Sequence, residues 1–162
     1  MVDCEELFVP ILEHESGGRV FQMLNLDSTK SDYNELLKVA RRFASGGHTV
    51  HILSAVHYKD PLYIKVFGEL MESRYYRKCP DLLVDGEFVE FESFKTDDSR
   101  NAFRNMLHNG LAQSDRVVLR HCNLTEGYMR RMIYSKISRG IPVEEVWIWD
   151  GEDLRLLYKT EG

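Results

Sequence analysis

A two-residue reverse turn is predicted at Asp85-Gly86, in the middle of segment 81–92. An Asp-Gly pair between short apolar runs is the strongest short-range signal for a β-hairpin, because a type I′ turn needs a positive φ at both central residues. In the hairpin that this turn would close, Asp81 lies directly opposite Glu90. Residues so placed share one face of the ladder, and their Cβ atoms are roughly 5 Å apart. The turn therefore predicts two carboxylates side by side.

One face of this hairpin is expected to be apolar, with the side chains of Leu82, Val84, Val89 and Phe91. The other face gathers three carboxylates, from Asp81, Glu90 and Glu92. Like charges directly across a ladder are destabilising, so packing alone explains this face poorly. A hard divalent cation such as Mg²⁺ binds carboxylate oxygens and would explain it. The sequence thus predicts a metal site at these three acids, and an acidic, solvated face of an edge hairpin is the alternative.

The rest of the pattern predicts an α/β fold, with a mixed central β-sheet flanked by helices. Further strands are expected at 6–12, 19–24, 49–53, 116–120, 143–149 and 154–158. Helices are expected to begin at polar residues that can cap them, namely Ser31 or Asp32, Asp98 or Ser99, and Thr125. The residues expected to face inward on the last two helices are Phe103, Met106, Leu107, Gly110, Leu111, Met129, Met132, Ile133 and Ile137. Segment 60–78 suits either a helix opened by Pro61 or irregular structure. No repeat or linker interrupts the chain, so we expect a single domain over residues 1–162.

Cysteine usage and hydropathy favour a cytoplasmic protein. No apolar run approaches the roughly 20 residues that span a bilayer, and the N-terminus lacks the basic and apolar regions of a signal peptide. Cys4, Cys79 and Cys122 form no CxxC pair and cannot all pair internally. We therefore expect reduced thiols, no membrane contact, and neither structural zinc nor a disulfide framework.

Positive charge is concentrated in segment 100–140, which has eight Lys/Arg against two Asp/Glu in a chain of formal net charge −5. A basic segment beside a carboxylate cluster fits an enzyme that holds a polyanion while metal-bound carboxylates act on it. Ordinary solvated helix faces would explain the charge equally well. Because Arg forks match phosphate geometry, the predicted nucleic-acid contacts are Arg100, Arg104, Arg130 and Arg131.

Other chemistries find no support in the sequence. The six histidines show no HExxH or similar ligand spacing, and all but His108 are expected to be structural or surface residues. No nucleophile elbow, P-loop or dinucleotide fingerprint occurs, which argues against acyl transfer and nucleotide-dependent reactions. Glu35 is a second acidic candidate, at the edge of the apolar stripe of its helix. That stripe is expected to consist of Leu36, Leu37, Ala40, Phe43 and Ala44. A favourable carboxylate near a helix N-terminus explains Glu35 as well.

Short motifs between residues 33 and 120 form an ordered series: Asn34-Glu35, Gly47-His48-Thr49-Val50, Cys79-Pro80-Asp81, Glu90-Phe91-Glu92, Ser99-Arg100-Asn101 and Ala112-Gln113. This series resembles the tRNA-nuclease domain at the C-terminus of CdiA-type contact-dependent growth inhibition toxins. The order and spacing carry the resemblance, rather than any single motif. It implies a restriction-endonuclease-like fold of the PD-(D/E)xK type and Mg²⁺-dependent cleavage of RNA, typically tRNA. It maps the catalytic acids onto Glu35, Asp81 and Glu90, and implies a cognate immunity protein as partner.

The chain departs from the family pattern at Glu92, where the Glu-x-Lys form of the motif has lysine. Lys95, Arg104 or His108 would have to supply the missing positive charge. Two alternatives to an active nuclease follow: a catalytically degenerate module that binds nucleic acid or protein, and a metal-independent ribonuclease fold of the barnase or colicin kind. Exposed strands at both termini also leave edge pairing, and hence a homodimer, open.

Overall fold

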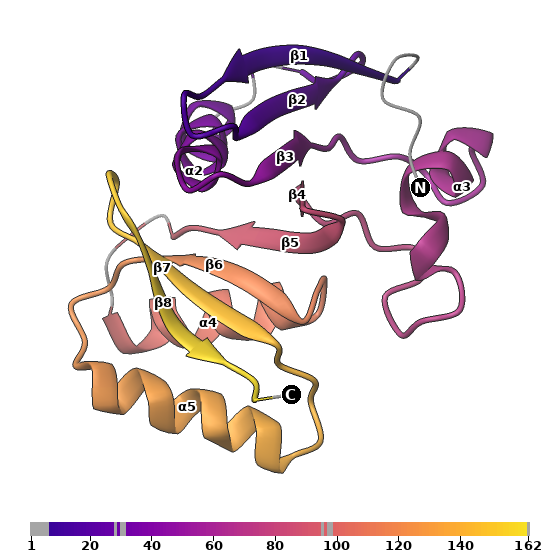
Figure 1. Cartoon of the computed structure of the whole chain (residues 1–162). Coiled ribbons are helices and arrows are strands. Elements are labelled where there is room, and N and C mark those ends of the chain that lie inside the picture. The colour runs from indigo at the N-terminus through magenta and orange to yellow at the C-terminus, as the bar shows by residue number, and fades with distance from the viewer. Residues whose placement is uncertain (1–6, 28, 30–31, 95, 97–98, 162) are drawn as a thin grey trace. The chain divides into compact units, whose positions relative to one another are not determined.

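The computed structural model describes the chain except for residues 1–6, 28, 30–31, 95, 97–98 and 162 (Figure 1). The described residues form a mixed α/β structure, which confirms the predicted fold class. They divide into two compact units, residues 1–88 and residues 89–162. The restriction-endonuclease-like topology and the single domain over 1–162 stay predictions.

The strands of the first unit are β1 (Phe8–Glu13), β2 (Arg19–Met23), β3 (Thr49–Ile52) and β4 (Leu82–Val84). β2 is antiparallel to β1 and parallel to β3, and β3 is antiparallel to β4. Parallel strands need a crossover connection, and α2 (Tyr33–Ser45) supplies it between β2 and β3. The strands expected at 6–12, 19–24 and 49–53 are thus present.

α2 packs through one apolar stripe, formed by Leu36, Val39, Ala40, Phe43 and Ala44. The expected stripe contained Leu37 in place of Val39, and this was wrong, since Leu37 is only half-buried. Helical neighbours recur at three and four residues, so Leu36 is followed on its face by Val39 and Ala40.

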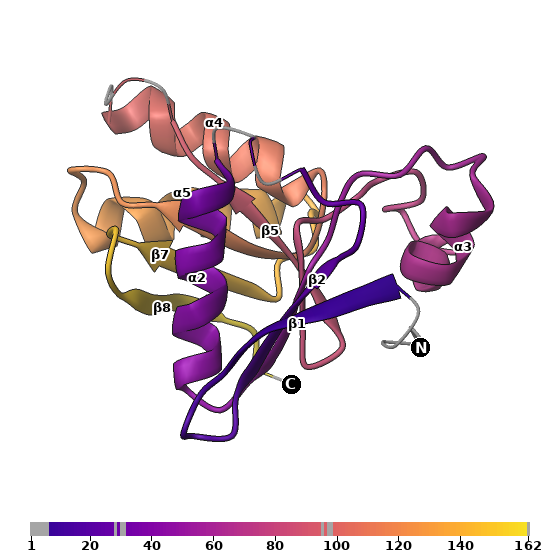
Figure 2. The ribbon, with the colours of Figure 1, turned by 90° about the horizontal axis from the view of Figure 1, so that it is seen from above.

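α3 (Pro61–Phe67) lies on the opposite side of these strands from α2 (Figure 2). Asp60 Oδ1 accepts a hydrogen bond from Leu62 N at 2.9 Å and caps the helix, and Pro61 occupies its first turn. A short 3₁₀ turn, η1 (Gly68–Leu70), follows. Segment 60–78 therefore begins with the helix opened by Pro61. The buried apolar cluster on this side is Phe8, Met23, Leu53, Val56, Tyr63, Val66, Phe67, Leu70 and Tyr75.

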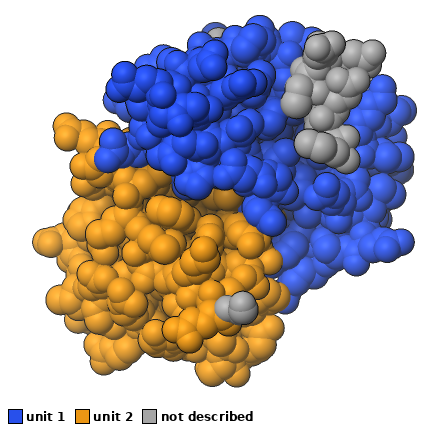
Figure 3. Space-filling view, in the orientation of Figure 1, with its two compact units in different colours: residues 1–88 blue, residues 89–162 orange. Residues whose placement is uncertain are grey.

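The second unit, orange in Figure 3, contains most of β5 (Glu87–Glu92), with β6 (Arg116–Arg120), β7 (Glu145–Trp149) and β8 (Leu154–Lys159). β6 is parallel to both β5 and β7, and β8 is antiparallel to β7. α4 (Ser99–Leu111) follows β5, and α5 (Glu126–Ser138) connects β6 to β7. Thr125 Oγ1 accepts a hydrogen bond from Tyr128 N at 3.2 Å, which confirms the predicted cap of α5. Two other predicted cap residues, Ser31 before α2 and Asp98 before α4, lie outside the described residues.

The core of this unit lies between the helices and one face of β6 and β7. Its buried members are Ala102, Phe103, Met106, Leu107, Leu111, Val117, Leu119, Cys122, Met129, Ile133, Val143, Val146, Ile148 and Leu157. Met132 and Ile137, which were expected inside, are only half-buried against this cluster.

The predicted turn at Asp85-Gly86 is present, with a φ of 49° at Asp85 and 86° at Gly86. Positive φ at both positions is the requirement of a type I′ turn. The Asp85 carboxylate also ties the turn to the start of β3: its Oδ1 accepts from Thr49 N at 2.8 Å, and its Oδ2 lies 2.5 Å from His48 Nδ1. The turn is therefore held by side-chain contacts as well as by backbone geometry.

These contacts predict a pH dependence of stability. Partial burial acts to raise the pKa of Asp85, but the hydrogen bonds from His48 and Thr49 N outweigh it, so this pKa lies below its ordinary value. A carboxyl with a lowered pKa in the folded state stabilises above its unfolded pKa of about 4, and this stabilisation is lost as the pH falls. Because the side chain is half exposed, we expect less than about 1 kcal/mol.

Asp85→Asn tests this directly. The free energy of unfolding in urea should be lower for the variant than for the wild type at pH 7, and the difference should shrink toward pH 3. A difference of the same size at both pH values would mean that ionisation of Asp85 contributes nothing.

No helix in the described part of the chain is long and apolar enough to cross a membrane. Cys79 and Cys122 are free thiols, the first half-buried and the second buried, and Cys4 lies outside the described residues.

Candidate functional site

Asp81 belongs to the first unit and directly precedes β4. Its carbonyl oxygen accepts a hydrogen bond from Leu53 N at 2.8 Å, and its side chain is half-buried. Leu83 lies opposite His51 in the β3–β4 register, so strand alternation puts Asp81 on the face of Leu83 and His51. Burial raises the pKa of the Cys79 thiol, and the Asp81 charge raises it further, which places that charge near Cys79.

Glu90 and Glu92 belong to the second unit and lie on one face of β5. In the parallel β5–β6 register, Glu90 is beside Val117 and Glu92 is beside Leu119. Val117 and Leu119 are core residues on the helix-covered side, so both glutamates face the helices. Glu90 is only 8% exposed, an unusual position for a carboxylate, which is costly to bury without partners.

Gly110 of α4 makes room for the side chain of Glu92. A Cβ at Gly110 would lie 3.0 Å from Val117 Cγ1 and 3.2 Å from Glu92 Cγ. The helix backbone therefore approaches β5 and β6 so closely that a side chain would compete with the stem of Glu92. The sequence predicted Gly110 to face inward, but it gave no sign of this contact.

Two carboxylates on one face are a suitable start for a Mg²⁺ site, because hard cations prefer oxygen ligands. Within the described ranges, no group of three or more His, Cys, Asp or Glu side chains is arranged to hold a metal ion. Asp81 and Glu90 belong to different units, so a metal site that includes both would take its ligands from each unit. The metal site at Asp81, Glu90 and Glu92 therefore stays a prediction.

The remaining predicted catalytic residues lie on separate elements. Glu35 is in the first turn of α2, half-buried, in the first unit. His108 is exposed on α4, in the second unit, with Nδ1 3.2 Å from Lys136 Nζ. Burial and the charge of Arg139 lower the pKa of Lys136. Lys95 lies outside the described residues.

The helices of the second unit carry a group of basic side chains that we call the α4/α5 basic surface: Arg100, Arg104, His108, Arg131, Lys136 and Arg139. The guanidinium carbons of Arg100 and Arg131 lie 5.7 Å and 5.6 Å from the ring centre of Tyr128, so this tyrosine links the two helices. No arginine of this surface has a carboxylate partner among the residues that the structure describes. Arg130, by contrast, donates to Glu126 at 2.8 Å. Three of the four predicted nucleic-acid contacts thus remain available to an anion.

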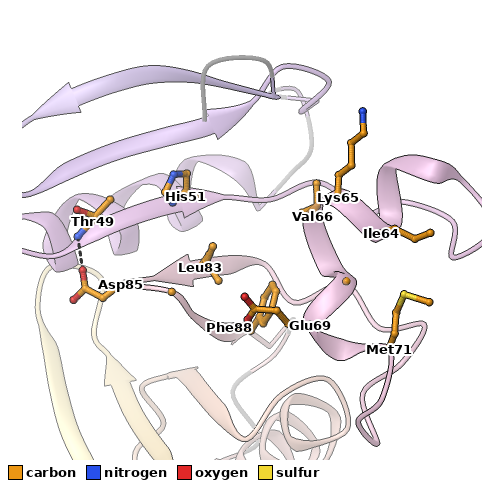
Figure 4. Close-up of a pocket in the computed structure, with 12 residues that line it drawn as sticks. Thr49, His51, Ile64, Lys65, Val66, Glu69, Met71, Leu83, Asp85 and Phe88 are labelled. Atoms are coloured by element: carbon orange, nitrogen blue, oxygen red, sulfur yellow. Dashed lines mark hydrogen bonds between the residues drawn. The ribbon is translucent and has the colours of Figure 1, made fainter. Parts of the chain in front are cut away.

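A cavity of about 690 Å³ in the first unit was not foreseen from the sequence (Figure 4). Its lining comes from β3, α3, η1 and the turn region: Thr49, His51, Ile64, Lys65, Val66, Gly68, Glu69, Met71, Leu83, Asp85, Gly86 and Phe88. His51 is 9% exposed and stacks on Phe21 with ring centres 5.0 Å apart, and burial lowers its pKa. The cavity brings together three segments far apart in the sequence, and no local pattern predicts that.

Comparisons with known proteins give little to add. No family model matches the chain, and no curated protein matches its sequence. Among solved structures, the chain is similar to a CdiA-CT/CdiI toxin and immunity complex from Burkholderia pseudomallei. The identity is 17% and the TM-score 0.49, over 85% of this chain and 91% of the other.

Proposed function

We propose that the chain is a small Mg²⁺-dependent endoribonuclease of toxin type that cleaves phosphodiester bonds of tRNA. One observation carries the proposal: Glu90 and Glu92 share one face of β5 beside Gly110, in the same unit as the α4/α5 basic surface. Glu90, which is buried, and Glu92, which is half-buried, would hold a cation, and the arginines of the α4/α5 basic surface would hold a polyanion.

In this proposal Glu90, Glu92 and Asp81 hold the metal ion, and Glu35 assists them. When bound, Mg²⁺ supplies a Lewis acid that activates water and neutralises charge on the scissile phosphate. Glu90 is buried in the middle of β5, beside Val117 of β6. Its side chain is therefore restrained by the strands around it, and its carboxylate would need little reorganisation to bind an ion. This preorganisation is what the fold of the second unit contributes.

The α4/α5 basic surface is proposed to bind the RNA backbone. Arg100, Arg104 and Arg131 would contact phosphates, which would make binding strongly salt-dependent. The replacement of the motif lysine by Glu92 leaves the catalytic cation to another residue. Of the candidates, Arg104 and His108 are both described and exposed on α4, and His108 Nδ1 lies 3.2 Å from Lys136 Nζ.

A toxin of this type is expected to act on cytoplasmic RNA and to have a cognate immunity protein as partner. That protein would cover the acids, the basic surface, or both. A homodimer is not required by this proposal.

The test is incubation of the purified protein with total tRNA, with Mg²⁺ and with EDTA in its place. The proposal predicts discrete tRNA fragments with Mg²⁺ and intact tRNA with EDTA. Intact tRNA under both conditions would favour the degenerate binding module. Equal cleavage under both would favour a metal-independent ribonuclease.

A further inference from the structure

Two connections of the first unit, residues 57–59 and 74–78, meet in a stack of planar side chains. The rings of His57 and Tyr58 lie 4.7 Å apart and 25° from parallel. The Arg77 guanidinium carbon lies 4.2 Å from the Tyr58 ring centre, and Tyr76 meets the Tyr58 ring edge-on at 6.0 Å. We call His57, Tyr58, Tyr76 and Arg77 the Tyr58 stack. His57 and Arg77 are exposed, so planar surface at both residues is open to solvent.

The backbone at Arg77, a member of the Tyr58 stack, adopts a strained conformation. Its φ is 75°, in the left-handed region that is unfavourable for a residue with a Cβ. Buried contacts hold it there: Tyr63 Oη donates to the carbonyl of Lys78 at 2.9 Å, and Tyr63 is fully buried against Phe67. Strain that the surrounding structure maintains is typical of functional positions.

Positive charge surrounds the Tyr58 stack. Lys59, Arg74, Arg77 and Lys78 have no carboxylate partner within the part of the chain that the structure describes. The carboxylate closest in sequence, Asp60, is used as the cap of α3. The stack therefore combines exposed planar groups, which can stack on a base, with nearby cations, which can contact phosphates.

We infer that the Tyr58 stack binds an unpaired nucleotide of single-stranded RNA, which adds a second RNA contact to the proposed function on which this inference rests. Single-stranded RNA is recognised by stacking its bases on aromatic rings and guanidinium planes, with nearby cations on its phosphates. Duplex RNA keeps its bases paired and stacked internally, so it has no base to offer. The stack is thus a specificity element for unpaired regions and takes no part in the cleavage chemistry.

The test is a fluorescence-anisotropy titration, without Mg²⁺, of a short oligouridine and of an RNA duplex of equal length. Arg77→Gly is the main variant, because glycine adopts this φ without strain and the protein should be at least as stable as the wild type. Loss of one stacking group should weaken oligouridine binding about tenfold. Arg77→Lys keeps the charge and loses the plane, so most of that weakening should persist. Lys38→Ala, which removes an exposed charge from α2, is the matched control and should have less than about a twofold effect.

Oligouridine affinity that is the same in Arg77→Gly, Arg77→Lys and wild type would overturn the inference, as would equal binding of duplex and single strand. The experiments distinguish failure of this inference from failure of the proposed nuclease function. A protein that binds oligouridine through Arg77 but leaves tRNA intact contradicts the nuclease proposal only, whereas one that cleaves tRNA with binding unaffected by Arg77→Gly contradicts the inference only.

Discussion

Glu90→Gln is expected to lower the rate of Mg²⁺-dependent tRNA cleavage by about a hundredfold or more. The amide has nearly the shape of the carboxylate, so the buried site next to Val117 should keep its packing. It lacks the negative charge that a hard cation requires. Asp81→Asn should have an effect of similar size if Asp81 completes the site. The measurement is the initial rate of tRNA fragment formation, with thermal unfolding to establish that each variant is folded.

Glu87→Gln is the matched control for these variants. Glu87 is an exposed acid at the start of the same strand, β5, and points away from the predicted metal site. Its replacement should leave the cleavage rate within about twofold of the wild type. Equal rates for Glu90→Gln and Glu87→Gln would show that the acidic face of β5 is not catalytic.

Gly18→Ala is expected to lower the free energy of unfolding by about 3 kcal/mol or more. A Cβ at Gly18 would lie 1.8 Å from the carbonyl oxygen of Ala44. The obstacle is the backbone of α2, which cannot rotate aside as a side chain could. The turn before β2 would have to separate from the end of the helix. Urea unfolding of the variant against wild type measures the effect.

Gly127→Ala provides the comparison at a glycine without neighbours. A Cβ there meets no atom within 4 Å, and Gly127 lies in the first turn of α5. Alanine favours a helix over glycine by up to about 1 kcal/mol, so this variant should be as stable as wild type or more stable. If Gly18→Ala were equally well tolerated, the close approach of Gly18 to α2 would be wrong.

Local features of this fold were predictable from the sequence because they depend on short-range chemistry. The turn at Asp85-Gly86 follows from the φ requirement of its two residues. The cap at Thr125 and the opening of a helix at Pro61 follow from hydrogen-bond and φ preferences in the first helical turn. Each of these signals lies within a few residues of the feature that it predicts.

Features that join distant segments were not predictable in the same way. The room that Gly110 leaves for Glu92 depends on how closely α4 approaches β5, and a glycine in a helical pattern does not report that distance. The Tyr58 stack depends on Arg77, from a segment that suited irregular structure, meeting the ring of Tyr58 on the other side of α3 in the sequence. The Leu37 error has a different cause, since an apolar residue at the edge of a stripe can be only half-buried.

The most direct test of the central claim is a titration with Mn²⁺, a paramagnetic substitute for Mg²⁺, followed by electron paramagnetic resonance. The claim is that carboxylates of segment 81–92 hold a divalent cation. The wild type should bind Mn²⁺ at a site that Mg²⁺ competes for, and Glu90→Gln should lose that binding while Glu87→Gln keeps it. Absence of Mn²⁺ binding by the wild type, or equal binding by all three proteins, would contradict the claim.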